Sequence, residues 1–307
     1  MYKPKVIVIC GPTASGKTAL SIELAKKING EIISCDSMQI YKDMNIGTAK
    51  VTEDEMQGIC HYLIDFVSPD ERYSVADYKV DSEKAIEKII SKGKTPIIVG
   101  GTGLYVDSLI YGIEYPEIKF DEKYRNELEK EADEKGLETL YNKAKEIDEQ
   151  AMQKISINDR KRIIRVLEIY HATGKNKTEQ EIESRKKEIK YDYKIFAINM
   201  DREKLYERIN IRVDRMLENG LIEEVENLQK KYNHFPTAMQ GLGYKEVVEY
   251  LQSQITREEM IEKIKQESRR YAKRQLTWFR KNKQTIWIDG LANLEDNINI
   301  IEKELNK

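Results

Sequence analysis

The sequence predicts an α/β fold, in which a parallel sheet flanked by helices is interrupted by a mostly helical insertion. Short β-branched runs alternate with helical patterns over residues 5–99, which is typical of parallel strands joined by helical crossovers. After Tyr115-Pro116 a highly charged stretch follows, without proline and without a clear strand pattern. Strand-like runs return at 194–199 and 285–289, so we expect the sheet to be completed after the insertion.

The elements before the insertion each have a local signal. Residues 5–10, KVIVIC, form a β-branched run that ends at Gly11, which is the pattern of a buried strand. Apolar residues at four-residue spacing predict a helix over 18–28, which Gly30 ends. Two further strands are expected at 31–35 and 96–99, separated by a helix over 74–91 that begins at Ser74.

The rest of the chain is expected to be largely helical. In the insertion, amphipathic patterns predict helices over 121–135, 137–147 and 159–171. Long helices are expected over 203–218, 221–231, 244–251 and 257–282. These expectations give a core domain of residues 1–117 and 192–307 and an insertion domain of residues 118–191.

The composition excludes several classes of protein. Apolar residues make up 40% and charged residues 35% of the 307 residues, and no apolar run approaches the roughly 20 residues that a membrane-spanning helix needs. We therefore expect neither a membrane span nor a signal peptide. The three cysteines lie 25 residues apart with no CxxC pair, so a disulfide framework or cysteine zinc site is not expected. Reduced cysteines fit a cytoplasmic protein.

One segment is strongly basic although the net charge of the chain is only −2. Residues 268–283 contain seven basic residues and no acidic one, with Tyr271, Trp278 and Phe279 interleaved. Cationic side chains neutralise phosphates, and aromatic rings stack on unpaired bases. A helix with a solvated basic face and an aromatic core stripe explains the same pattern. The residues alone therefore leave the RNA-binding interpretation open.

The most specific motif is GxxxxGK[ST], which lies between the first predicted strand and the first predicted helix. It is matched in full by Gly11, Pro12, Thr13, Ala14, Ser15, Gly16, Lys17 and Thr18. Backbone N–H groups and the helix N-terminus attract phosphate oxygens in such a loop. Lys17 supplies a full charge, and the Thr18 hydroxyl can reach a phosphate-bound Mg²⁺. The motif predicts a di- or triphosphate site in a P-loop NTPase-like fold, without saying what the phosphate carries.

Two further segments follow predicted strands and should meet the phosphate loop, because the carboxyl ends of parallel strands share one edge of a sheet. Asp36 follows the second strand and can act as a Mg²⁺ ligand, a general base or a helix cap. Residues 100–103, Gly-Gly-Thr-Gly, follow the third strand, where ordinary P-loop ATPases place a carboxylate. This substitution argues against an ordinary ATPase, although a tight turn that lets a helix pack closely explains the glycines equally well.

Several blocks together resemble one family, the tRNA dimethylallyltransferases. The matching stretches occur in family order and cover essentially the whole chain: 11–25, 33–50, 61–66, 73–78, 97–105, 158–175, 208–217, 240–246 and 273–280. DSMQIY at 36–41 and KRQLTWFR at 273–280 are much more specific than the phosphate loop. No Cys/His pair follows Trp287, so the zinc finger of eukaryotic relatives is expected to be absent, and with it any zinc. This points to a bacterial-type enzyme.

The resemblance implies transfer of a dimethylallyl group from dimethylallyl diphosphate to N6 of adenosine 37, beside the anticodon of tRNAs that read codons beginning with U. The products would be N6-(dimethylallyl)adenosine and diphosphate. The phosphate loop would hold the diphosphate leaving group with Mg²⁺, which fits the missing carboxylate after the third strand. The partners implied are the anticodon stem-loop, with adenines at 36, 37 and 38, and the prenyl diphosphate. We expect a monomer, because no long heptad pattern occurs.

The resemblance also implies roles for individual residues. Asp36 corresponds to the proposed general base, and Thr102 and Lys17 complete the implied catalytic set. The implied diphosphate contacts are Gly11 to Thr18, with Arg208 and Arg212 approaching from the opposite side and Thr18 on the Mg²⁺. The implied tRNA contacts are Asp36, Ser37, Met38, Gln39, Thr102, Arg125, Lys161, Arg162, Arg165, Gln240, Gly243, Tyr244, Lys245, Lys273, Arg274, Gln275, Trp278 and Arg280.

Two other classes of protein share some of these features. A nucleotide or metabolite kinase would use the same loop and sheet, with the helical insertion as a lid, and would prefer ATP to dimethylallyl diphosphate. A non-catalytic, GTPase-like RNA-binding module would need an NKxD motif to read guanine. The nearest sequence, Asn176-Lys177-Thr178-Glu179, fails at the fourth position.

Overall fold

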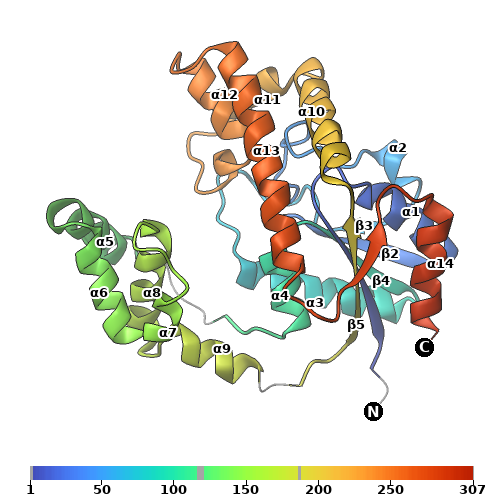
Figure 1. Ribbon diagram of the computed structural model, residues 1–307, viewed down its shortest axis with the longest axis horizontal. Coiled ribbons are helices and arrows are strands. Elements are labelled where there is room, and N and C mark those ends of the chain that lie inside the picture. Colours follow the sequence, from blue (N-terminus) through green and yellow to red (C-terminus); the bar gives the residue numbers. More distant parts are fainter. Residues whose placement is uncertain (1–2, 116–120, 186–187, 307) are drawn as a thin grey trace. The chain divides into compact units, whose positions relative to one another are not determined.

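A six-stranded parallel sheet forms the centre of the protein in the computed structural model, which describes residues 3–115, 121–185 and 188–306 (Figure 1). The strands are β1 (Lys5–Cys10), β2 (Gly30–Cys35), β3 (His61–Tyr62), β4 (Thr95–Gly100), β5 (Asp192–Asn199) and β6 (Ile286–Asp289). Their order in the sheet is β3-β2-β4-β1-β5-β6, with every neighbouring pair parallel. The predicted α/β class with a parallel sheet is confirmed.

The register of the central strands brings three loops together. Cys10 at the end of β1 lies opposite Gly100 of β4 and Ala197 of β5, and Cys35 at the end of β2 also lies opposite Gly100. The segments that begin at Gly11, Asp36 and Gly101 therefore leave the sheet side by side at its carboxyl edge. This is the edge at which ligands bind in open α/β sheets.

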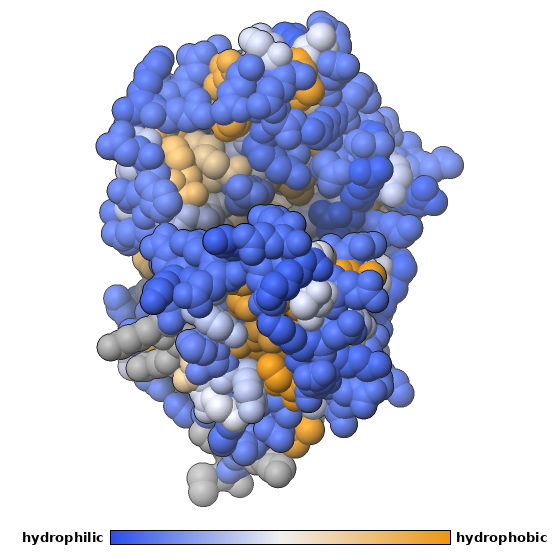
Figure 2. Space-filling view, turned by 90° about the vertical axis from the view of Figure 1, so that its left-hand side faces the viewer, coloured by the Kyte–Doolittle hydropathy of each residue, from blue (hydrophilic) through white to orange (hydrophobic). Residues whose placement is uncertain are grey.

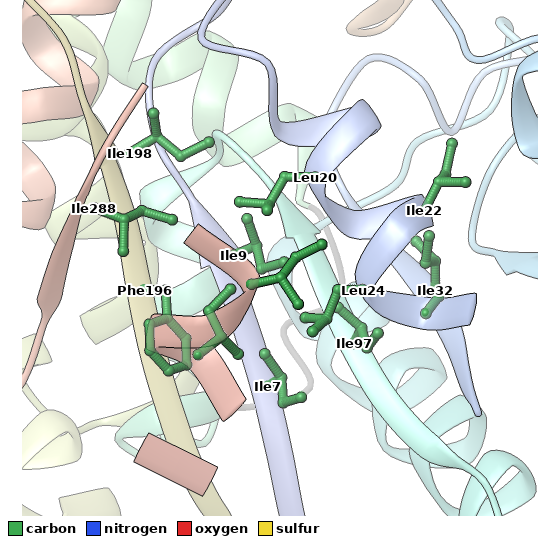
Figure 3. Close-up of a cluster of buried hydrophobic side chains, with 13 residues drawn as sticks. Ile7, Ile9, Leu20, Ile22, Leu24, Ile32, Ile97, Phe196, Ile198 and Ile288 are labelled. Atoms are coloured by element: carbon green, nitrogen blue, oxygen red, sulfur yellow. The ribbon is translucent and has the colours of Figure 1, made fainter. Parts of the chain in front are cut away.

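Helices cover both faces of the sheet. α1 (Lys17–Lys27) and α14 (Leu294–Leu305) lie together on one face, and α3 (Val75–Ser91) contacts β2 and β4 from the other (Figure 1). Alternate strand residues point to opposite faces, so Ile7, Ile9, Ile97 and Phe196 meet the α1 side chains Leu20 and Leu24 in a buried cluster (Figure 3). Ser74 caps α3 through a capping box with Asp77, as its place before the apolar pattern predicts.

A second layer of helices stands over the carboxyl edge of the sheet. It consists of α10 (Arg202–Glu218), α11 (Leu221–Lys231), η1 (Ala238–Gln240), α12 (Tyr244–Leu251) and α13 (Arg257–Phe279). Their apolar faces share a core with the segment that follows β2, where Ile40, Tyr41 and Met44 are fully buried. That segment also carries α2 (Glu53–Met56). The phosphate loop and the segment after β2 are therefore held between the sheet and these helices.

Residues Asp107–Ile189 form a separate compact unit, and the rest of the chain forms the other. This unit contains α5 (Glu122–Lys135), α6 (Leu137–Ile147), α7 (Glu149–Met152), α8 (Arg160–Thr173) and α9 (Lys177–Arg185). It has its own core, in which Leu140, Ile163 and Ile164 are fully buried. Aspartates at 121, 148 and 159 cap α5, α7 and α8. The predicted boundary between 117 and 118 lies outside the described residues, so the predicted domain limits remain a proposal.

The predicted elements occur within a few residues of their expected positions, and some elements were not predicted. The predicted helix over 257–282 ends at Phe279. The unpredicted elements are β3, α2, α4 (Gly103–Ile110), α7, α9, η1 and α14. Within the described parts of the chain, no helix is long and apolar enough to cross a membrane. Hydrophilic side chains dominate the face seen in Figure 2, with hydrophobic side chains in small groups.

Candidate active site

The phosphate loop joins β1 to α1 in the strand–loop–helix arrangement that its motif requires. Gly16, the residue before α1, has φ 91°, in the left-handed region that favours glycine. A Cβ on Gly11 would lie 3.2 Å from the Ile198 carbonyl oxygen, so this end of the loop crosses β5 closely. Ser15 Oγ is buried and has no hydrogen-bond partner among the described residues. A phosphate oxygen would satisfy this hydroxyl.

The Lys17 side chain is half-buried, and its ammonium group reaches back into the loop. It donates hydrogen bonds to the carbonyl oxygens of Gly11 (3.1 Å) and Pro12 (2.7 Å). Burial and the nearby Arg212 guanidinium lower the pKa of Lys17 to about 8, against the opposing effect of Asp36. Two half-buried cations therefore lie close together, and Asp36 only partly offsets their repulsion. An anionic group such as a diphosphate would remove this imbalance.

Asp36 begins the segment after β2, and its carboxylate holds a turn. Oδ1 accepts hydrogen bonds from the backbone N–H groups of Met38 (2.9 Å) and Gln39 (3.3 Å). The helix cap that the sequence left open is not formed, because a turn and not a helix follows Asp36. Both bonds go to Oδ1, so the orientation of the carboxylate is fixed while Oδ2 can receive a substrate proton. One carboxylate can thus hold the turn and serve as a base.

Thr102 connects the turn after β4 to the Asp36 segment. The Ser37 N–H donates to Thr102 Oγ1 (3.1 Å), and the two hydroxyls lie 3.4 Å apart. The Tyr271 hydroxyl also interacts with Thr102, and its pKa is raised by burial and by the charge of Asp36. Burial lowers the pKa of Arg212 below its usual value, and the charge of Asp36 opposes this shift only in part. Asp36 therefore lies within electrostatic reach of Lys17, Arg212 and Tyr271.

A cavity of about 280 Å³ opens beside these residues. Predicted site residues that line it are Thr13, Asp36, Ser37, Met38, Arg212, Gln240, Tyr244, Lys245 and Arg274. Its wall combines polar side chains with Met216, Leu242 and Ile264. Such a mixed wall suits an aromatic ring with polar edges or a short prenyl chain. Arg212 also lines a second cavity of about 660 Å³, which includes Arg208, Arg215 and Ala14 of the phosphate loop.

The glycines at 100–103 allow close contact with β2 and α13. A Cβ on Gly100 would lie 2.0 Å from the Cys35 carbonyl oxygen, and a Cβ on Gly103 would lie 2.4 Å from the Trp278 ring. A Cβ on Gly101 would lie 2.0 Å from Gln275 Nε2. None of these distances admits a methyl group without a shift. The interpretation of this segment as a tight turn that lets a helix pack closely is therefore supported.

Some residues predicted to touch RNA are buried. Gln275 is 5% exposed, and its side chain bonds to the backbone at Thr13 and Gly101. Tyr244 is 0% exposed, and its hydroxyl donates to Glu224 (2.7 Å). Gly243 is also buried, at the start of α12. The hydrogen bonds of Gln275 and Tyr244 therefore support the loops around the site, while the RNA contacts of Gln275, Tyr244 and Gly243 stay predictions.

Other predicted RNA contacts lie on accessible surface. Lys273, Arg274 and Arg280 are exposed along and just beyond α13, whereas Trp278 is half-buried against Gly103. Arg274 lies over the Tyr271 ring, 5.6 Å from its centroid. Exposed cations therefore lie along α13, and one of them, Arg274, also lines the cavity.

The helical unit carries the remaining predicted contacts and is described by itself. Lys161, Arg162 and Arg165 are exposed on α8. Arg125 forms an ion pair with the buried Glu168 (3.0 Å), which Arg165 also contacts at 3.3 Å. Arg125 therefore has a structural partner within this unit, and any RNA contact would use its remaining donors.

Tyr271 and Glu224 lie at the site but were not predicted as site residues. Tyr271 lies one helical turn before Gln275 on α13, and Trp278 follows at the next turn. This spacing places all three on one helix face, a signal that the sequence contained. Glu224 accepts hydrogen bonds from the backbone N–H groups at Asn45 (2.8 Å), Ile46 (2.7 Å) and Gly47 (3.1 Å). It fixes the loop that forms the cavity wall, and no sequence pattern signalled it.

The described residues contain no group of three or more His, Cys, Asp or Glu side chains that could hold a metal ion. The exposed Thr18 at the start of α1 stands beside Lys17. This donor set resembles a site in which Mg²⁺ arrives with phosphate oxygens and water rather than a dedicated protein cage.

Comparisons with known proteins agree with this geometry. The family model described as IPP transferase matches residues 39–282. The tRNA dimethylallyltransferase of Acetivibrio thermocellus is 55% identical over 285 residues, covering 92% of this chain and 91% of the relative. That of Bacillus anthracis is 47% identical over 289 residues, covering 94% of this chain and 92% of the relative.

Solved structures lead to the same family. The tRNA isopentenylpyrophosphate transferase of Bacillus halodurans has a TM-score of 0.74 at 42% identity, covering 99% of this chain and 96% of that one. A eukaryotic dimethylallyltransferase, described as acting on tRNA, has a TM-score of 0.79 at 35% identity, covering 94% of this chain and 74% of that one. The expected resemblance is confirmed, and the chain belongs to the IPP transferase family.

Proposed function

We propose that this protein transfers a dimethylallyl group from dimethylallyl diphosphate to N6 of adenosine 37 in tRNAs that read codons beginning with U. The observation that carries the proposal is the meeting of a phosphate loop with the Asp36 carboxylate at one cavity. Family membership supports tRNA prenylation as the class of reaction. The target base, the codon class and the identity of each contact belong to the proposal alone.

The donor end of the site suits a leaving diphosphate. Lys17 and Arg212 provide positive charge in a desolvated place, and Ser15 offers a hydroxyl. Positive charge fixed where negative charge develops lowers the barrier for departure of an anion. Mg²⁺, held through Thr18 and the diphosphate oxygens, would add Lewis-acid stabilisation of the leaving group. Arg208, at the second cavity, would approach the diphosphate from the side opposite the loop.

The acceptor end suits the adenine amine. The bond between the allylic carbon and the diphosphate oxygen breaks, the electron pair leaves with the diphosphate, and the N6 lone pair forms the new C–N bond. Asp36 Oδ2 receives the N6 proton, while Oδ1 keeps its bonds to Met38 and Gln39. Thr102 and Ser37 position the base edge beside the carboxylate. The adenine must leave the stacked anticodon loop to reach this cavity.

The RNA would be held by charge outside the cavity. Lys273, Arg274 and Arg280 supply phosphate contacts beside the site, with Gln240 and Lys245 at its rim. Met38 and Gln39 lie beside the acceptor base in this arrangement. We include the exposed Lys161, Arg162 and Arg165, together with Arg125, as anticodon-loop contacts of the 118–191 domain. The proposal also includes a monomer in the cytoplasm, because the proposed reacting residues come from one chain and tRNA is the substrate.

The test is single-turnover transfer of labelled dimethylallyl from its diphosphate to an anticodon stem-loop with adenines at 36, 37 and 38. A matched stem-loop carries guanosine at 37. We expect label only in the first RNA, and label in both would refute the target base. Transfer to neither, with phosphate released from ATP instead, would favour the kinase alternative.

A further inference from the structure

One buried side chain connects the donor and acceptor halves of the site. The Thr13 N–H in the phosphate loop donates to Gln275 Oε1 at 2.9 Å. Gln275 Nε2 donates to the carbonyl oxygen of Gly101 at 3.0 Å, one residue before Thr102. Gln275 is 5% exposed, so solvent competes little for these bonds.

The two loops contribute different halves of the proposed reaction. The phosphate loop positions the leaving diphosphate through Lys17 and Ser15. The turn after β4 positions the acceptor through Thr102, which receives the Ser37 N–H beside Asp36. β1 and β4 pair directly, but their pairing ends at Cys10 and Gly100. Beyond that point the Gln275 amide connects one loop to the other.

The absence of a side chain at Gly101 leaves the room that the Gln275 amide occupies. A Cβ at Gly101 would lie 2.0 Å from Gln275 Nε2 and 3.2 Å from Gln275 Cδ, while the nearest backbone atom, the Gly11 oxygen, would be 3.3 Å away. Gly101 is not among the glycines with positive φ. A methyl group there would therefore displace the amide rather than strain the backbone.

We propose that Gln275 is a positioning residue that sets the separation between the diphosphate loop and the acceptor-side turn. It touches neither substrate and acts by holding Thr13 and Gly101 at fixed places. This inference rests on the proposed prenyl transfer. Because the transfer needs the allylic carbon and N6 at near-attack distance, a shift of one loop against the other lowers the rate of chemistry more than binding.

Steady-state transfer with the full-length protein tests this role in three variants. Gln275→Met keeps the shape and removes both hydrogen bonds. Gly101→Ala keeps Gln275 and displaces its amide. Gln266→Met, at an exposed position on the same helix, is the matched control. We expect kcat to fall about 10- to 100-fold in the first two variants, with KM for each substrate and the Kd for inorganic pyrophosphate changed less than about threefold.

The double variant gives a sharper result. If both changes break the same bridge, Gln275→Met combined with Gly101→Ala should lose no more rate than either change alone. Losses that multiply would overturn the proposal, as would wild-type kcat in Gln275→Met. Equal weakening of kcat and pyrophosphate binding would also overturn it, because that pattern indicates general damage to the loop.

Amide hydrogen exchange provides a reading that does not depend on folding of a variant. In the unaltered protein the Thr13 amide should be protected, because its N–H is bonded to a buried side chain. Exchange at the rate of an unprotected loop amide would overturn the bridge. If the unaltered protein transfers no prenyl group, the proposed function fails, while this measurement still tests the bridge.

Discussion

The lowered pKa of Lys17 predicts that diphosphate binding weakens as the pH rises. Burial, followed by repulsion from Arg212, brings this pKa from 10.5 to about 8, which corresponds to about 3 kcal/mol of cost to the charged form. Binding of an anion reverses that cost, so the pKa of Lys17 rises in the complex. Affinity should therefore be nearly constant below about pH 7, fall to about half at pH 8 and reach roughly one-tenth at pH 9.

The assay is titration of the enzyme with inorganic pyrophosphate between pH 7 and 9.5 at constant ionic strength. Lys17→Arg is the matched control, because arginine stays protonated throughout this range. Protonation of pyrophosphate itself affects both proteins equally, so the ratio of their dissociation constants isolates Lys17. That ratio should change about fivefold from pH 8 to 9 and about tenfold from pH 7 to 9. Parallel curves for the two proteins would refute the reasoning, whatever their absolute affinities.

Three other variants test separate parts of the structure. Asp36→Asn keeps an oxygen for the Met38 N–H and should lower the single-turnover rate at least about 100-fold, with stem-loop affinity within about threefold. Neutralising Arg274 and Arg280 together should weaken tRNA binding and reduce the slope of log affinity against log salt by about 1.5. Glu31→Gln should lower the free energy of unfolding by about 2 kcal/mol, because the buried carboxylate binds Lys92 and Lys94 at 2.9 Å each and both lysines are partly exposed.

Each of these predictions has an outcome that contradicts it. An unchanged transfer rate in Asp36→Asn would remove the base assignment. The salt slope of the arginine variant is compared with that of Lys230→Gln combined with Lys303→Gln, two exposed lysines on α11 and α14. Equal slopes for the two double variants would refute the proposed RNA-binding surface on α13.

The stability prediction has a pH signature. Bonds from Lys94, Tyr62 and Lys92 lower the pKa of Glu31 to about 2 despite the opposing effect of burial. A carboxyl whose pKa is lowered by folding contributes its full stability above its ordinary pKa of 4.5, and that contribution is lost as the pH falls toward 2. Denaturant unfolding between pH 5 and 3 should therefore vary more steeply in the unaltered protein than in Glu31→Gln. Equal slopes would argue against the network.

The fold could be predicted where local signals were strong. The run KVIVIC, the glycine-rich loop and the apolar spacing after Lys17 each specify their own structure. β3 is only two residues long and is recognisable only by its pairing with β2. α4 begins at Gly103 directly after a glycine-rich turn, where local preference opposes a helix. Packing against the rest of the fold decided both elements.

The candidate site, like the fold, could be predicted from the sequence only in part. Asp36 and Lys17 were predictable because both follow strands whose carboxyl ends share one edge. The burial of Gln275 and Tyr244 was not predictable, because it depends on how α12 and α13 lie over distant loops. Their polar groups are hydrogen-bonded inside the protein, to the phosphate loop, the turn after β4 and Glu224.

The length of the edge strands has a consequence for assembly. The sheet ends at β3, with two residues, on one side and at β6, with four residues, on the other. The long apolar strands β1 and β4 lie inside, where both of their hydrogen-bonding edges are occupied. A second chain that paired with either edge strand could form only a few backbone hydrogen bonds, because these strands are short. Concentrated solutions of the folded enzyme should therefore resist growth into fibrils through the ends of this sheet.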